Sequence, residues 1–126
     1  MPRIALIVED SDAAAATLEV ALARIPGLDS AWVGGGIDAW KYLNGPNGAQ
    51  VCAVLTDLNM PGMDGSELIA NVRAAERHRH LPIIVISGNP EPGISARVIS
   101  LGANAFFPKP YSPAAVCSKL EELLNA

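Results

Sequence analysis

Short hydrophobic runs alternate with longer mixed stretches along this chain, and four of the runs end directly at polar residues. Apolar runs of four to six residues, bounded by turn residues, are typical of strands in a buried parallel sheet. A weaker run at residues 30–33 predicts one more, shorter strand. The four strong runs and their following residues are 4–8 before Glu9 and Asp10, 51–56 before Asp57, 83–86 before Ser87, and 105–108 before Lys109.

The stretches between these runs carry helical patterns. Ser11 or Asp12 can cap a first helix by accepting a backbone N–H, and this helix is expected to reach Ile25, before Pro26-Gly27. Strands that alternate with helices indicate an α/β fold with a parallel sheet. The sequence therefore predicts one domain of five strands and five helices. The other helices are expected at residues 37–43, 66–77, 94–101 and 112–124.

Composition narrows the class of protein. The chain has 126 residues, of which 50% are hydrophobic and 17% charged, which favours one folded domain over disorder. A net charge of -4 argues against direct nucleic-acid binding, and the apolar stretches are shorter than the ~18 residues needed to cross a bilayer. A strand that begins just after Met1 leaves no room for a signal peptide. Cys52 and Cys117 make no disulfide framework and are expected to be small buried hydrophobes, so a soluble cytoplasmic protein is predicted.

The strand ends predict a chemical site. In open α/β sheets, ligands bind outside the carboxyl ends of the strands. If the first and third strands are neighbours, a spacing of about 4.8 Å puts Asp10 and Asp57 within reach of one cation, with Glu9 beside them. Oxygen ligands at two or three protein positions suit Mg²⁺, Lys109 suits a phosphoryl oxygen, and Ser87 offers a hydroxyl. These groups predict a magnesium-assisted phosphoryl or phosphate site, with Asp57 as the best nucleophile.

Four motifs, in this order and spacing, resemble the receiver (CheY-like) domain of bacterial two-component response regulators: Glu9-Asp10, the loop from Asp57 to Gly65, Ser87-Gly88 and Lys109-Pro110. The resemblance covers residues 1–126. It implies a flavodoxin-like, doubly wound, five-stranded parallel sheet of order 2-1-3-4-5 with five helices. It also implies that Asp57 accepts a phosphoryl group from a histidine kinase or a histidine phosphotransfer protein, as part of a signalling module rather than an enzyme proper.

The same resemblance implies roles for the remaining site residues. Asp10, Asp57 and the backbone carbonyl of Asn59 would ligate Mg²⁺, with Glu9 acting largely through a bound water. Ser87 and Lys109 would contact the phosphoryl oxygens, and Phe106 would be the switch aromatic. The surface formed by residues 94–101, 105–108 and 112–124 would bind a downstream effector, or a second copy of the chain after phosphorylation.

Ser87, Phe106 and Gly88, which replaces the usual alanine, depart from the commoner family pattern. Ser87 stands where threonine is more frequent and keeps the hydroxyl, so phosphoryl transfer is expected to survive. Phe106 replaces a frequent tyrosine, so switching would rest on packing alone.

Parts of the same pattern also occur in proteins of other functions. A phosphatase of the haloacid dehalogenase type also uses an Asp nucleophile with Mg²⁺, but its acid/base is an Asp two residues later, where this chain has Asn59. A flavodoxin-like electron carrier would bind the FMN phosphate in a first loop that here opens with Glu9-Asp10, which would repel it. A degenerate receiver that acts only as a binding module remains an alternative, although no essential group is missing.

Three further features have structural interpretations. Arg77-His78-Arg79-His80 is expected to be a solvated helix C-terminus, where cations suit the helix dipole. Trp32 and Trp40 are expected to be core or half-buried. The triplet Gly34-Gly35-Gly36 lacks the pattern of a dinucleotide-binding loop.

Overall fold

The structure is a computed structural model that describes residues 3–125. Its centre is a five-stranded parallel sheet of order β2-β1-β3-β4-β5, which confirms the predicted fold class and strand order. The first and third strands are therefore neighbours. The strands are β1 (Arg3–Val8), β2 (Leu28–Val33), β3 (Val51–Thr56), β4 (Ile83–Ser87) and β5 (Ala105–Pro108).

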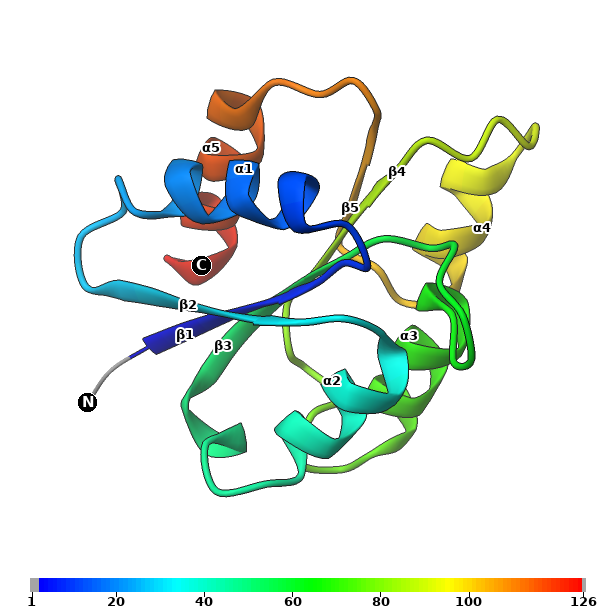
Figure 1. The fold of residues 1–126 in the computed structure, drawn as a ribbon. Coiled ribbons are helices and arrows are strands. Elements are labelled where there is room, and N and C mark those ends of the chain that lie inside the picture. Colours follow the sequence, from blue (N-terminus) through cyan, green and yellow to red (C-terminus); the bar gives the residue numbers. More distant parts are fainter. Residues whose placement is uncertain (1–2, 126) are drawn as a thin grey trace.

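Helices cover both faces of this sheet. Figure 1 shows α1 and α5 on one face and α2 and α3 on the other, with α4 beside α3. The helices are α1 (Asp12–Leu22), α2 (Gly36–Leu43), α3 (Gly65–Ala74), α4 (Ile94–Leu101) and α5 (Pro113–Leu124), with a short 3₁₀ helix, η1 (Gly48–Gln50), before β3. No helix within residues 3–125 is long and apolar enough to cross a membrane.

The two faces of the sheet bury separate hydrophobic clusters. Along β1, Ala5 and Ile7 point into the cluster under α1 and α5, whereas Leu6 and Val8 point into the cluster under α2, α3 and α4. This alternation follows from the two-residue period of a strand. It explains why the runs are apolar throughout, since both faces are covered.

Serine side chains cap two helices, α1 through Ser11 as predicted and α5 through Ser112, which was expected to be the first residue of that helix. Ser11 Oγ accepts a hydrogen bond from the Ala14 N–H at the start of α1. Ser112 accepts from the Ala115 N–H at the start of α5, with Pro113 in the first turn. Both serines satisfy backbone donors that the helix itself leaves free.

Two helices are shorter than the sequence pattern predicts. α1 ends at Leu22 rather than Ile25, and a turn follows in which the N–H of Ile25 bonds to the carbonyl of Leu22. Ile25 is nevertheless buried, so its apolar character reflects a packed turn and not a further helical turn. α3 ends at Ala74 rather than Arg77, because Ala75 has extended backbone angles.

Several side chains lie elsewhere than expected. His78 is buried, not solvated, and its ring meets the edge of Trp40, which is half-buried as predicted. Trp32 is exposed, because it lies on the edge strand β2. Cys52 and Cys117 are half-buried, and burial raises the pKa of each thiol, so both stay protonated at neutral pH.

Candidate functional site

The parallel register brings the polar strand ends to one edge of the sheet. Val8 of β1 is paired with Thr56 of β3, so the residues that follow, Glu9 and Asp57, start from neighbouring positions. The N–H of Asp57 donates to the Val8 carbonyl, which extends the pairing by one residue. On the other side of β3, the pairing of β4 with β5 ends at Ser87 and Pro108, just before Lys109.

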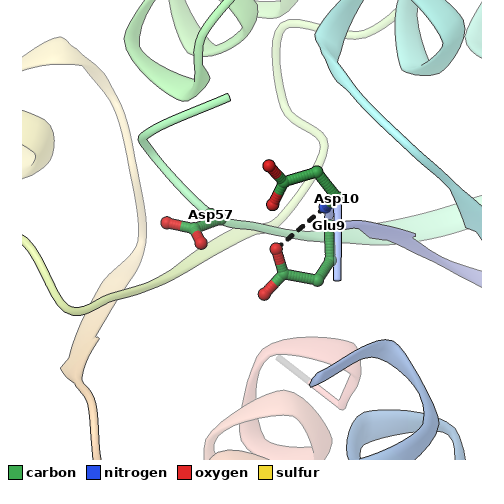
Figure 2. A group of neighbouring side chains, drawn as sticks. All are labelled: Glu9, Asp10 and Asp57. Atoms are coloured by element: carbon green, nitrogen blue, oxygen red, sulfur yellow. Dashed lines mark hydrogen bonds between the residues drawn. The ribbon is translucent and has the colours of Figure 1, made fainter. Parts of the chain in front are cut away.

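Three carboxylates meet at this edge, as predicted. Glu9, Asp10 and Asp57 each offer one oxygen, and these oxygens lie within 4.8 Å of one another (Figure 2). Glu9 is buried, Asp57 is half-buried and Asp10 is exposed. Glu9 Oε2 accepts a hydrogen bond of 2.9 Å from the N–H of Asp10, the contact drawn in Figure 2. Burial raises the pKa of Glu9, and the charge of Asp57 adds to this effect although the Lys109 hydrogen bond opposes it.

Lys109 lies among these carboxylates. Its Nζ donates to Glu9 Oε1 at 2.9 Å and to Asp57 Oδ2 at 3.1 Å. Burial opposes the charge of the ammonium, but the bonds to Glu9 and Asp57 outweigh it and raise the pKa of Lys109. One lysine thus balances part of a surplus of negative charge, and its ammonium stands beside the oxygen atoms of Asp57.

The loop after β3 orients Asp57. The N–H of Leu58 donates to Asp57 Oδ1 at 2.6 Å, and the N–H of Asn59 reaches the same oxygen at 3.4 Å. The first residue of α3, Gly65, packs directly against the Asp57 backbone, because a Cβ added at Gly65 would overlap the Asp57 carbonyl oxygen. The loop N–H groups hold one oxygen of the Asp57 carboxylate, and the side chain keeps 13% of its surface exposed to solvent.

Ser87 and Phe106 lie on β4 and β5, the strands on the other side of β3 from β1. Ser87 is buried at the end of β4, and its Oγ accepts from the N–H of Asn89 at 3.1 Å. Asn89 Nδ2 in turn donates to Asn59 Oδ1 at 3.4 Å, which joins the loops that follow β3 and β4. Phe106 is half-buried and packs against the cluster that contains Ile94 and Val98 of α4.

Sequence reasoning missed one residue that touches this site. The indole Nε1–H of Trp32 donates to the backbone carbonyl of Glu9 at 2.7 Å. The sequence signal for this contact is the position of Trp32 near the end of β2, the strand that precedes α2. Using that signal requires knowing that β2 lies beside β1.

The chemistry of the acidic cluster fits a small divalent cation. All three donors are carboxylate oxygens, which hard cations such as Mg²⁺ and Mn²⁺ prefer. The cluster carries a larger negative charge than Lys109 can balance, and Asp10 is open to solvent. A cation that keeps several of its waters suits such a half-open site.

Comparison with known proteins agrees with this geometry. The family model described as the response regulator receiver domain matches residues 5–121. The chain belongs to the response regulator receiver family. It is 30% identical over 120 residues to a CheY chemotaxis protein homologue of Campylobacter jejuni, covering 95% of this chain and 91% of that one. It is 31% identical over 120 residues to the chemotaxis protein CheY1 of Helicobacter pylori, covering 95% of each.

Solved receiver structures show the same fold. The receiver domain of a signal transduction histidine kinase from Syntrophus aciditrophicus superimposes with a TM-score of 0.87 at 28% identity, covering 98% of this chain and 90% of that one. A response regulator receiver protein from Pseudomonas putida gives 0.81 at 31% identity, covering 99% and 97%. The chain is thus a CheY-like receiver domain, and this family is a signalling module of two-component systems.

Proposed function

We propose that residues 1–126 form one receiver domain in which Asp57 accepts a phosphoryl group from a phosphohistidine of a histidine kinase or histidine phosphotransfer protein. The observation that carries this proposal is the position of Asp57, which lies beside two other carboxylates and 3.1 Å from the ammonium of Lys109. Such a nucleophile has both a candidate cation site and the positive charge of Lys109 beside it. Phosphoryl transfer needs this arrangement because its catalysis is mainly positioning and charge stabilisation.

The transfer itself would use one Asp57 oxygen as the nucleophile. The oxygen forms a bond to phosphorus while the bond from phosphorus to the donor histidine nitrogen breaks, and the nitrogen keeps the electron pair. The hydrogen bond from the Leu58 N–H to Oδ1 holds the carboxylate in one orientation before attack. This orientation lowers the entropic cost of aligning nucleophile and donor.

Asp10, Asp57 and the backbone carbonyl of Asn59 would hold Mg²⁺, with Glu9 acting through a bound water. When bound, the ion neutralises charge on the phosphoryl oxygens. Lys109 would exchange its carboxylate partners for a phosphoryl oxygen, and the Ser87 hydroxyl would donate to another. Ser87 Oγ is an acceptor in the present structure, so its own proton remains available for that bond.

The proposed output surface is the face formed by α4, β5 and α5, which would bind a downstream effector or, after phosphorylation, a second copy of the chain. Phe106 lies beside α4 and Ile99 of α4 is 45% exposed, so a change in the packing of Phe106 can alter the surface of that helix. In this proposal the chain is cytoplasmic, contacts neither membrane nor nucleic acid directly, and catalyses only its own phosphorylation and dephosphorylation.

Phosphoramidate, a small donor that contains a phosphorus–nitrogen bond, tests this function. After incubation with Mg²⁺, borohydride reduction followed by peptide mapping should find the reduced acyl phosphate at Asp57, and EDTA should abolish it. Labelling at another residue, or labelling that persists in EDTA, contradicts the proposal. No labelling at all favours the alternative of a degenerate receiver that only binds partners.

A further inference from the structure

The C-terminal end of β2 supports the backbone of Glu9 from outside the site. β1 and β2 pair up to Val8 and Val33, and the N–H of Glu9 then donates to the Val33 carbonyl at 3.1 Å. Beyond Val33 the chain turns toward α2, which is capped by Gly35. The indole of Trp32 supplies the next donor, at 2.7 Å from the Glu9 carbonyl. Both backbone groups of Glu9 are therefore held by β2.

The start of α2 supports the loop that follows Asp57. A Cβ added at Gly36 would lie 2.3 Å from the carbonyl oxygen of Met63 and 3.0 Å from its carbonyl carbon. The atoms in the way belong to backbone, so they could not be displaced by rotating a side chain. Only glycine lets α2 approach the loop this closely. A Cβ at Gly34, in the same triplet, would meet nothing within 4 Å.

We propose that Trp32 and Gly36 are positioning residues for the magnesium site, Trp32 through the Glu9 backbone and Gly36 through the loop that carries Asn59. This inference rests on the proposed function. It assigns a role to the last glycine of the triplet, and it makes the segment from β2 to α2 a determinant of metal affinity.

The physical argument is that Mg²⁺ tolerates little distortion of its ligands. The ion requires near-octahedral geometry with oxygen distances of about 2.0–2.1 Å. Asp10 follows Glu9 directly, and its N–H is bonded to the Glu9 side chain, so a shift of the Glu9 carbonyl moves both acidic residues. Asn59 and Met63 lie in the same short loop between β3 and α3, so a displaced Met63 moves the Asn59 carbonyl. Groups that orient ligands in this way affect metal affinity without touching the ion.

Titration with Mg²⁺, followed by ¹H–¹⁵N NMR, tests the proposal on the whole chain. The informative variants are Trp32→Phe, which keeps an aromatic ring but loses the N–H, and Gly36→Ala. Each should raise the Mg²⁺ dissociation constant roughly three- to tenfold, which for Trp32→Phe is the effect expected from losing about one hydrogen bond. The Trp32 indole signal of the wild type should shift on adding Mg²⁺, and the Trp40 signal should not.

Matched controls separate positioning from general damage. Trp40→Phe removes the other indole, and Gly34→Ala adds a methyl where there is space. Both controls should bind Mg²⁺ as the wild type does. In Trp32→Phe and Gly36→Ala, saturating Mg²⁺ should restore the rate of phosphorylation by acetyl phosphate, which general unfolding would not permit.

Unchanged dissociation constants in folded Trp32→Phe and Gly36→Ala overturn the inference and leave the proposed function intact. A wild type that fails to bind Mg²⁺ overturns the proposed metal site and the inference with it. A Gly36→Ala variant that does not fold contradicts a role of Gly36 limited to positioning, and Trp32→Phe then decides the Trp32 part.

Discussion

Lys109 Nζ lies 3.1 Å from Asp57 Oδ2, although the two residues are 52 positions apart in the chain. The strand order brings them together, because β3 and β5 flank β4 and all three end at the same edge. The same ammonium bonds to Glu9. Lys109 therefore occupies carboxylate oxygens that a cation would also use, and it stands where an incoming phosphoryl group needs positive charge.

Replacing Lys109 by alanine should tighten Mg²⁺ binding and still permit labelling of Asp57. Removal of the competing ammonium leaves Glu9 and Asp57 free for the cation, and the dissociation constant should fall roughly three- to tenfold. The conformational response to phosphorylation should be blunted, because the lysine no longer contacts the phosphoryl group. Calorimetric titration and NMR of the phosphorylated state measure the two effects.

Lys119→Ala is the matched control, since Lys119 pairs with Glu122 on α5, away from the site, and its side chain is as exposed as that of Lys109. Weaker Mg²⁺ binding in Lys109→Ala than in Lys119→Ala would contradict the account of competing cations.

Gly65→Ala should destabilise the domain and impair phosphorylation together. The new methyl group would overlap the Asp57 carbonyl, and overpacking of this kind costs about 1–3 kcal/mol of the free energy of unfolding. Gly88→Ala is the control, because its Cβ would lie 3.8 Å from Lys109 Cβ, an ordinary contact. Urea unfolding and acyl-phosphate yield provide the measurements, and equal stability of the two variants would show that α3 can move back without cost.

The fold could be predicted from sequence because its main determinants are local. Four of the five strands contain apolar runs bounded by turn residues, and Ser11 marks the start of the first helix through its own hydrogen bond. The carboxylate cluster could be predicted for a related reason: each member lies within two residues of a strand end, so strand order brings Glu9, Asp10 and Asp57 together.

The errors concern residues whose environment depends on distant packing. Ile25 continues the apolar pattern of α1 but lies in a turn that packs on the core. His78 looks like part of a charged helix end, yet the chain turns there and places its ring against Trp40 of α2. The role of Trp32 depends on the register between β1 and β2, which no local pattern specifies.

The buried His78 predicts loss of stability in mild acid. Burial lowers the pKa of His78, and the charge of Arg77 adds to this, although a hydrogen bond with the Leu43 backbone opposes both. Below the ordinary histidine pKa of 6.5, the unfolded chain binds a proton at this position, whereas the folded chain binds it only at a lower pH. The free energy of unfolding therefore falls as the pH drops from 6.5 toward the pKa of His78 in the folded chain. The slope contributed by one such group is at most about 1.4 kcal/mol per pH unit.

His78→Phe keeps an aromatic ring against Trp40 and should flatten this pH dependence between neutral and mildly acidic pH. His80→Gln is the control, since His80 is exposed. Thermal unfolding across this pH range compares the variants with the wild type. A slope unchanged by His78→Phe would mean that the buried ring accepts a proton in place.

The most direct test of the central claim is the intact mass of the protein after incubation with Mg²⁺ and acetyl phosphate, for the wild type and for Asp57→Asn. The account predicts that the wild type gains the mass of one phosphoryl group and that the variant gains none. Equal labelling of the variant would contradict the assignment of Asp57, and no gain in the wild type would contradict its role as a phosphoacceptor.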